Sequence, residues 1–253
     1  MLKHKIHSKA GLRRVGHHPD ISLDIEQLLA LVDGLPGDAV LLHEGERHRL
    51  YRGSLNGVDC VFKCTQSGKR HQRSLSDAFT AAVMLDRGWQ PCLPRPLALV
   101  EDWQGEQVTA SCVIYHYAPG RPLSELGADT QLPLIAALMA RLAEAGVHSR
   151  DFSAANLLLS TENDPPQLLL LDLEALVPRP PSALDLARMI ARLRLTDKDT
   201  QQLRILLADN HDIAISRPLL RLARSVLLPL RDLNQHPAGR RFRRWLRTAT
   251  FKG

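Results

Sequence analysis

The stretch that decides the fold is GVHSRDFSAANLLL, residues 146–159, followed by LLLDLE, residues 169–174. Three polar side chains, those of Asp151, Asn156 and Asp172, bracket two short apolar runs in it. Carboxylates beside such runs are costly to bury unless they have a partner. A divalent cation is one such partner, since Mg²⁺ prefers carboxylate, amide and phosphate oxygens as ligands. The alternative is that Asp151 and Asn156 cap turns and that Asp172 ends a strand.

The apolar runs themselves predict a short hairpin within a mainly helical region. Residues 157–160 and 167–171 are expected to be strands, joined by a turn that contains two prolines. Apolar residues at helical spacing predict helices over 132–145, 183–195, 197–208 and 217–233. Ser182 and Thr196 are good N-caps for the second and third of these helices.

The chain before residue 118 carries strand signals instead. Short runs between residues 39 and 63 surround Asn56-Gly57, a dipeptide that favours a tight hairpin turn. Ser22 is the expected N-cap of the first helix of the chain. Other expected elements are helices at 23–32 and 75–87 and strands within 91–103 and at 107–117. Because strands and helices segregate in this way, the pattern predicts an α+β protein with two lobes.

Three segments are expected along the chain. Residues 1–38 are predicted to form a basic N-terminal extension with one helix. Residues 39–117 are predicted to form an N-lobe, made of an antiparallel sheet plus one helix. A turn at Ala118-Pro119-Gly120 then leads into residues 118–253, a helical C-lobe that contains the hairpin and ends in a basic helix.

The composition is that of a globular protein. Of 253 residues, 44% are hydrophobic and 24% charged, which excludes a disordered tail, a coiled coil and a collagen-like fibre. No apolar stretch is long enough to cross a bilayer and the N-terminus lacks the apolar part of a secretory signal, so we expect a cytoplasmic protein. The cysteines form no CxxC pair, which disfavours zinc binding and favours roles as small buried hydrophobic residues. They are Cys60, Cys64, Cys92 and Cys112.

The charge indicates an acidic partner. The net charge is +6 and the pI about 9.4, which favours a nucleotide, a phosphorylated sugar or an anionic membrane surface. Near the C-terminus, RRFRRWLR (residues 240–247) places Phe242, Trp245 and Leu246 on one face of an expected helix. That face would lie peripherally on an anionic membrane, or alternatively pack on the protein with its arginines in water. There is no recognised nucleic-acid motif, so no nucleic-acid partner is expected, and the oligomeric state stays open.

Three motifs in order resemble those of the protein-kinase-like superfamily. The segment from His148 to Asn156, with Asp151 five residues before the asparagine, resembles the catalytic loop. Asp172-Leu-Glu stands where that superfamily has the metal-binding Asp-Phe-Gly, and Val-Phe-Lys63 ends a strand as its Val-Ala-Ile-Lys motif does. The resemblance implies a bilobal protein-kinase-like fold, with a β-rich N-lobe and a mainly helical C-lobe.

Within this superfamily the chain looks most like the bacterial lipopolysaccharide core kinases, the Kdo/heptose kinase family. The segments GWQPCLPRPLAL (88–99) and YAPGRPL (117–123) resemble the corresponding segments of that family. The resemblance implies an ATP- and Mg²⁺-dependent kinase that phosphorylates a sugar hydroxyl of the lipopolysaccharide inner core, at the cytosolic face of the inner membrane. Alternatives are a kinase for another small-molecule or protein Ser/Thr hydroxyl, and a regulatory pseudokinase that only binds nucleotide.

The resemblance assigns a role to each matching residue. Lys63 would hold the α- and β-phosphates of ATP, and Asp151 would orient the acceptor hydroxyl or accept its proton. Asn156 and Asp172 would hold Mg²⁺ against the phosphates. The adenine would meet the backbone of three residues: His116, Tyr117 and Ala118.

The chain departs from the superfamily pattern in three places. The nearest candidate for a phosphate loop is GERHR, residues 45–49, in which Arg47 or Arg49 would contact phosphate in place of a glycine-rich backbone. The helix glutamate that pairs with the lysine is missing, and Asp77 is the best substitute, with an ordinary surface acid as the alternative. Only residues 173–182 separate Asp172 from the next helix, which is too short for a peptide-binding activation segment and favours a small, sugar or lipid-linked acceptor.

Three neighbouring residues have open roles. His148 is expected to be a structural residue beneath the loop. Arg150 either pairs with a carboxylate or is solvated. Asp185 either hydrogen-bonds the loop from below or is a first-turn acid that the helix dipole favours.

Overall fold

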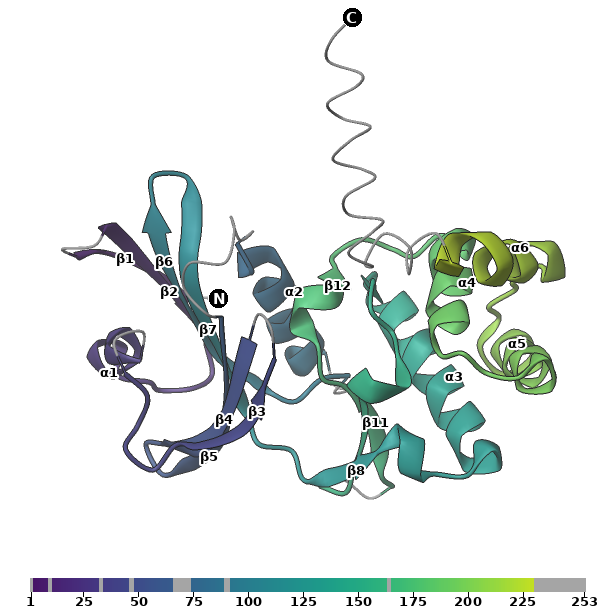
Figure 1. Ribbon diagram of the computed structural model, residues 1–253, viewed down its shortest axis with the longest axis horizontal. Helices are drawn as coiled ribbons and strands as arrows, with labels where there is room; N and C mark the ends of the chain where they lie inside the picture. The colour runs from purple at the N-terminus through teal and green to yellow at the C-terminus, as the bar shows by residue number, and fades with distance from the viewer. Residues whose placement is uncertain are drawn as a thin grey trace, which may run out of the picture. The chain divides into compact units, whose positions relative to one another are not determined.

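The computed structural model describes residues 2–8, 11–31, 34–45, 48–65, 74–88, 92–162 and 165–229. The chain divides into two compact units, one of Met1–Arg121 with Leu158–Pro178 and the other of Pro122–Leu157 with Arg179–Gly253. Strands concentrate in the first unit and helices in the second (Figure 1). The predicted α+β class, with a β-rich N-terminal part and a helical C-terminal part, is therefore confirmed.

The first unit is built on a seven-stranded antiparallel sheet in the order β1-β2-β6-β7-β5-β4-β3 (Figure 1). The strands are β1 (Leu2–Ser8), β2 (Gly11–His17), β3 (Val40–Glu44), β4 (His48–Leu55), β5 (Val58–Thr65), β6 (Pro96–Gln104) and β7 (Gln107–His116). The predicted hairpin joins β4 and β5 at Asn56 and Gly57, whose φ angles are 53° and 79°. Both angles lie in the left-handed region that this kind of tight turn requires, so the turn prediction is confirmed.

Strands β1 and β2 are absent from the prediction, which had a basic extension with one helix here. Arg13 is buried and its Nε lies 2.6 Å from Asp102 Oδ1, while Arg14 lies over the Trp103 ring at 3.8 Å. Both partners lie on β6, the neighbour of β2 in the sheet. In the sequence alone these arginines look like part of a solvated basic segment, because their partners lie far away along the chain.

Two helices pack in the first unit. Helix α1 (Ile25–Ala30) is shorter than the predicted 23–32, and its N-cap is Asp24, whose side chain accepts from the Glu26 N–H, in place of the expected Ser22. Helix α2 (Ser76–Arg87) packs against β6 and buries an apolar face that includes Phe79. Its start is fixed by Glu101, which accepts hydrogen bonds from the Ser74 hydroxyl and the Leu75 N–H. Burial raises the pKa of Glu101, and these donors oppose that rise.

The predicted hairpin after residue 156 is confirmed. Strands β10 (Leu157–Ser160) and β11 (Gln167–Leu170) form a three-stranded sheet with β8 (Gly120–Pro122), in the order β11-β10-β8. A Cβ at Gly120 would fall 2.3 Å from the Leu159 carbonyl oxygen, so the close approach of β8 to β10 requires glycine. The Leu170 N–H donates to the Cys92 carbonyl, and this bond ties the hairpin to the chain that leads into β6.

The remaining short elements of the chain are two strands and three 3₁₀ turns. They are β9 (His148–Ser149), β12 (Leu176–Val177) and the turns Leu123–Glu125, Ala154–Asn156 and Leu173–Ala175. The last turn and β12 pack against α2 within the first unit.

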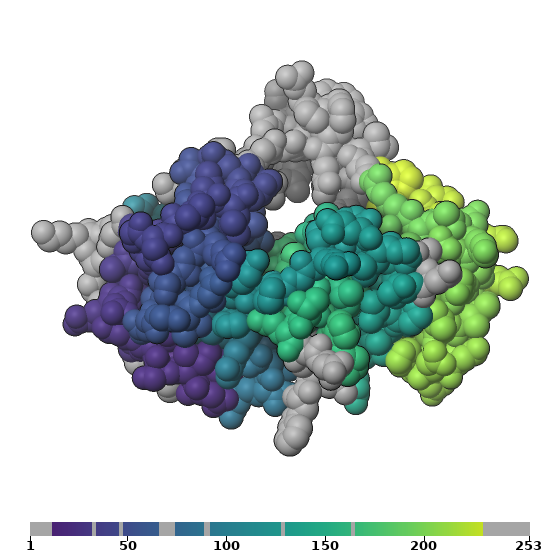
Figure 2. All heavy atoms as spheres, turned by 90° about the horizontal axis from the view of Figure 1, so that it is seen from below, coloured from purple at the N-terminus to yellow at the C-terminus, as the bar shows by residue number. Residues whose placement is uncertain are grey.

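The second unit is helical; in Figure 2 its helix α3 lies in the teal part of the colour range, and its later helices are green to yellow. Its helices are α3 (Ala128–Glu144), α4 (Ala183–Arg192), α5 (Asp197–His211) and α6 (Arg217–Leu222), the last continued by a π-helical turn, Ala223–Leu227. Ser182 and Thr196 cap α4 and α5 as predicted, since their side chains accept from the backbone N–H groups of Asp185 and Asp199. Helix α3 begins at Ala128, before the predicted residue 132. The predicted basic C-terminal helix, with Phe242, Trp245 and Leu246, lies outside the described residues.

Candidate active site

Lys63 stands at the centre of a charged cluster in the first unit. It lies on β5, where alternate residues Cys60 and Phe62 are fully buried in the core. The Lys63 side chain is 14% exposed, and its Nζ lies 2.8 Å from Asp172 Oδ1 and 3.3 Å from Glu174 Oε1. One ammonium group is therefore held between two carboxylates, in surroundings where each charge needs the others.

The two carboxylates reach Lys63 because of the turn that follows β11. Asp172 comes directly after the strand, and the next residue, Leu173, is fully buried and begins the 3₁₀ turn Leu173–Ala175. Burial of Leu173 anchors the turn, and Asp172 and Glu174 flank that anchor. The leucine in place of the superfamily's phenylalanine thus serves as the anchor, and the glutamate in place of its glycine adds a second acid.

The cluster shifts the pKa values of its members. Burial alone would lower the pKa of Lys63, but the charges of Glu174 and Asp172 outweigh it and raise the pKa. Tyr115, on β7, has a pKa raised well above its ordinary value by burial and by the same two carboxylates. Lys63 is therefore a permanent cation at working pH.

Sequence reasoning missed two members of this cluster. Glu174 was seen only as a departure from Asp-Phe-Gly, and His48 only as part of the phosphate-loop candidate. His48 Nε2 lies 3.4 Å from Glu174 Oε2, so the imidazole and the ammonium contact different oxygens of one carboxylate. The available signal for Glu174 was the sequence Asp-Leu-Glu in place of Asp-Phe-Gly. The extra acid lies two residues after the aspartate that the resemblance places in the site with Lys63, so an ion pair with that lysine could have been expected.

Two arginines, Arg47 and Arg49, were the candidates for phosphate contact. Arg47 lies outside the described residues. Arg49 is exposed, and its Nε donates to Glu44 Oε1 at 2.8 Å. The carboxylate of Glu44 thus neutralises the cation that the sequence offered for phosphate binding.

Asp77 does not take the place of the missing helix glutamate. It is exposed in the first turn of α2. Within the described chain, the carboxylates that pair with Lys63 are those of Asp172 and Glu174. Asp77 thus fits its alternative reading as a surface acid, and Glu174 supplies a carboxylate 3.3 Å from Lys63 Nζ.

The sequence predicts that adenine meets the backbone of residues 116–118, which we call the hinge. Two of the three backbone N–H groups of the hinge already donate hydrogen bonds within the protein. The His116 N–H donates to the Arg95 carbonyl and the Tyr117 N–H donates to the Asp59 carbonyl, each at 2.9 Å. Among the described residues, no hydrogen bond is seen from the N–H of Ala118, which is half-buried. Of the three hinge residues, Ala118 is therefore the one whose backbone donor is available to a ligand.

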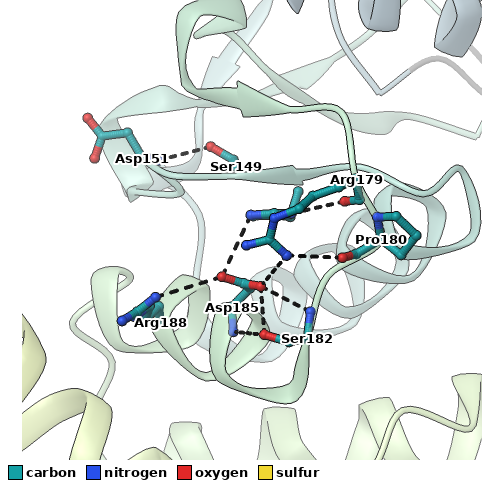
Figure 3. Close-up of polar contacts among 8 residues, drawn as sticks. Ser149, Asp151, Arg179, Pro180, Ser182, Asp185 and Arg188 are labelled. Atoms are coloured by element: carbon teal, nitrogen blue, oxygen red, sulfur yellow. Dashed lines mark hydrogen bonds and ion pairs between the residues drawn. The ribbon is translucent and has the colours of Figure 1, made fainter.

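In the second unit, the stretch that carries Asp151 rests on a buried polar network. His148 is buried, its Nδ1 lies 3.2 Å from the Arg179 carbonyl, and its Nε2 lies 3.7 Å from Asp185 Oδ1. Figure 3 shows Arg179, Ser182 and Arg188 converging on the Asp185 carboxylate. Asp185 thus completes the capping box of α4 as a first-turn acid, and its Oδ1 faces the His148 side chain; among the described residues no hydrogen bond between Asp185 and the loop backbone is seen. Burial would raise the pKa of Asp185, but hydrogen bonds from Ser182 and Arg179 hold it well below its ordinary value.

Asp151 itself points away from that network (Figure 3). Its side chain is 40% exposed, and its backbone N–H donates to Ser149 Oγ at 3.1 Å. The Asn156 amide nitrogen donates to the Asp151 carbonyl at 3.0 Å, which turns the amide oxygen of Asn156 away from the loop. Arg192 Nη1, from the last turn of α4, lies 3.5 Å from Asp151 Oδ1. Nothing in the sequence pattern marked Arg192.

Each unit therefore brings together some of the predicted residues. Lys63 and Asp172 meet in the first unit, and Asp151 and Asn156 meet in the second. Along the chain, Asn156 and Asp172 flank the β10–β11 hairpin. Their amide and carboxylate oxygens are the hard donors that Mg²⁺ takes, usually with only one or two protein ligands besides phosphate. The donor set fits that ion, although no group of three or more His, Cys, Asp or Glu suited to a metal occurs among the described residues.

Two further findings concern the whole described chain. The cysteines are free, with Cys60, Cys92 and Cys112 buried and Cys64 half-buried. In the ranges that the structure covers, no helix is both long and apolar enough to cross a membrane.

Known proteins match this chain in structure but not in sequence. No protein-family model and no curated protein matches the sequence. The structure of WaaP in complex with acyl carrier protein matches with 18% identity and a TM-score of 0.52, over 83% of this chain and 94% of that one. An aminoglycoside phosphotransferase APH(4)-Ia variant in ternary complex with ADP and hygromycin B matches with 16% identity and a TM-score of 0.50, over 83% and 90%. A microcompartment-associated aminopropanol kinase matches with 11% identity and a TM-score of 0.57, over 81% and 88%. These likenesses show that the chain has the predicted protein-kinase-like fold.

Proposed function

We propose that this chain is an ATP- and Mg²⁺-dependent kinase that phosphorylates a sugar hydroxyl of the lipopolysaccharide inner core. The observation that carries the proposal is the buried Lys63, paired with Asp172 at 2.8 Å and with Glu174 at 3.3 Å, in a protein-kinase-like fold. Among the similar structures, one named phosphotransferase is in complex with ADP and a hydroxyl-rich ligand, hygromycin B. The same use of the fold is proposed here.

Lys63 would bind the α- and β-phosphates of ATP. A cation that is already desolvated and oriented costs little reorganisation when phosphate arrives. The phosphates would replace the Asp172 oxygen at Nζ, while Glu174 keeps the ammonium in place. Asp172 would then be free for a second partner, which is the metal ion.

Asn156 and Asp172 would hold Mg²⁺, through the amide oxygen that faces away from the loop and the carboxylate that Lys63 releases. When bound, the ion neutralises phosphate charge and orients the phosphates for in-line transfer. Asp151 would accept the acceptor's proton or orient its hydroxyl, a role that suits a carboxylate with 40% of its surface open to solvent. The Ala118 N–H would donate to adenine.

The acceptor follows from the length of the chain after Asp172. Between Leu173 and Ser182 the chain holds only the 3₁₀ turn, β12, four loop residues (178–181) and the α4 cap at Ser182. A peptide acceptor would need a docking segment here, whereas a sugar needs only a pocket. The resemblance of 88–99 and 117–123 to the lipopolysaccharide core kinases selects the inner-core sugar. The basic C-terminal sequence, residues 240–247, supports work at the cytosolic face of the inner membrane, where it would meet an anionic glycolipid.

One observation favours a second acceptor class. The aminopropanol kinase has a TM-score of 0.57, above those of the other structures named here. A small amino alcohol is therefore the alternative substrate, and the site residues would keep the same roles.

The test is transfer of label from γ-labelled ATP with Mg²⁺ to dephosphorylated lipopolysaccharide core, with an amino alcohol and an aminoglycoside as parallel acceptors. Wild type, Asp151→Ala, Asp172→Ala and the control Asp77→Ala are compared. We expect label in the glycolipid with wild type and Asp77→Ala only. Label in the amino alcohol alone would show that the acceptor is an amino alcohol and not the lipopolysaccharide sugar, and it would support the proposed kinase activity. Nucleotide binding without transfer to any acceptor would favour the pseudokinase, and no nucleotide binding would sink the kinase proposal.

A further inference from the structure

Helix α4 contacts the Asp151 stretch at two points. Near its N-terminus, Asp185 lies 3.7 Å from His148, and at its last residue Arg192 lies 3.5 Å from Asp151. Both contacts fall inside the second unit. Asp185 and Arg192 are seven residues apart, which is two helical turns, so they lie on one face of α4. One helix face therefore contacts both ends of the segment that presents Asp151, His148 through Asp185 and Asp151 through Arg192.

Arg192 is fixed well enough for this task. Its side chain is 16% exposed, and the three residues before it, Met189, Ile190 and Ala191, are buried in the unit's core. The backbone of Asp151 is held by Ser149 and Asn156, and the contact with Arg192 is made by the carboxylate itself. An arginine has a planar fork of donors that fixes a carboxylate in direction as well as in place.

The loop has an arginine of its own, Arg150, directly before Asp151, and it is exposed. The arginine that the structure places 3.5 Å from the Asp151 carboxylate is Arg192, whose side chain is only 16% exposed. Phosphoryl transfer depends on positioning and on charge neutralisation, and an arginine from elsewhere in the protein often supplies the latter.

Resting on the proposed kinase function, we propose that Arg192, supplied by α4, is the positioning residue for Asp151. It holds the carboxylate toward the acceptor hydroxyl through the 3.5 Å contact. It acts on the acceptor side of the reaction and leaves ATP binding to the other residues.

The experiment compares wild type, Arg192→Met, Arg192→Lys and the control Arg221→Met, an exposed arginine on α6. We expect Arg192→Met to lower kcat by about 10- to 100-fold, the cost of misplacing a reacting group by about 1 Å. KM for ATP should stay within about two-fold of wild type. Arg192→Lys should recover part of kcat, and Arg221→Met should match wild type.

A second readout does not depend on turnover. The side-chain carboxyl ¹³C resonance of Asp151, assigned by its loss in Asp151→Asn, should move in Arg192→Met while that of Asp185 stays in place. An unmoved Asp151 resonance, an unchanged kcat, or a kcat loss matched by a rise in KM for ATP would each overturn the inference. If wild type transfers no phosphate to any acceptor, the kinase proposal fails, and the resonance alone still decides whether Arg192 holds Asp151.

Discussion

The two units hold their reactive carboxylates in different ways. In the first, Asp172 is fixed by charge: it shares a buried ammonium with Glu174, and each of the three groups needs the other two. In the second, Asp151 is fixed by scaffolding: backbone bonds, a helix face and the buried His148–Asp185 contact hold an open side chain. The first arrangement is therefore sensitive to substitutions that remove a charge. The second is sensitive to substitutions that disturb the structure beneath Asp151.

This difference predicts which substitutions affect rate and which affect stability. A neutralising change in the first unit leaves a buried charge without its balance, so catalysis should suffer first and in proportion to the charge removed. A change beneath Asp151 should loosen the fold and reach catalysis only indirectly.

The largest expected effect is that of Asp172→Asn. The amide keeps the shape but loses the charge that would hold the metal, so kcat should fall by about 1000-fold or more. Initial rates of phosphate transfer at saturating ATP measure it. Asp77→Asn, an exposed acid in the same unit, should stay within about two-fold. A comparable loss in both variants would restore Asp77 to the site and weaken the contrast between the units.

Glu174→Gln should have the next largest effect. The glutamine keeps the shape but removes the negative charge that lies 3.3 Å from the Lys63 ammonium, which costs about 2 kcal/mol or about 30-fold in kcat/KM for ATP. The control is Glu106→Gln, at the exposed turn between β6 and β7. If Glu174→Gln leaves kcat/KM unchanged, Lys63 is positioned by Asp172 alone.

The structural features that could be predicted from the sequence are the local ones. The Asn56-Gly57 turn, the β10–β11 hairpin and the caps Ser182 and Thr196 each depend on a few adjacent residues. Their local chemistry is enough to specify them. The order of three kinase-like motifs extends the same reasoning to the fold class.

The parts that could not be predicted depend on partners distant in sequence. Strand β2 is stabilised by Asp102 and Trp103, which lie about ninety residues on, so Arg13 and Arg14 look solvated in the sequence alone. Arg192 likewise contacts Asp151 across the whole hairpin. Sequence spacing contains no record of such pairs unless a known motif marks them, and here none does.

Asp185→Asn should cost stability more than rate. Asparagine can still cap α4, but it loses the charged bonds to Arg179 and Ser182, which should lower the free energy of unfolding by about 1.5 kcal/mol. Because the folded-state pKa of Asp185 is depressed, its carboxylate stabilises the protein above the pKa of an unfolded aspartate. That contribution is lost as the pH falls from about 5 toward the lower folded value.

Urea unfolding at pH 7, 4 and 3 tests this linkage, because most of the contribution is lost below the pKa of an unfolded aspartate, about 3.9. The difference in the free energy of unfolding between wild type and Asp185→Asn should be largest at pH 7 and should decrease as the pH falls. Asp199→Asn is the matched control, because Asp199 has the same position in the first turn of α5 but is only half-buried, whereas Asp185 is buried. A difference that does not change with pH would mean that hydrogen-bond geometry, and not charge, holds this part of the second unit.

The smallest expected effect is that of His48→Gln. His48 meets the outer oxygen of Glu174 while Lys63 meets the inner one, and both His48 and Glu174 are about a quarter exposed, at 28% and 24%. Solvent therefore weakens the contact, and kcat/KM for ATP should fall by only about three-fold, with His43→Gln on β3 as the exposed control. In a Glu174→Gln background, His48→Gln should have no further effect, because it acts only through that carboxylate. Additive losses would give His48 its own contact with the nucleotide, and the first unit would then hold phosphate with two cations where the present contacts predict one.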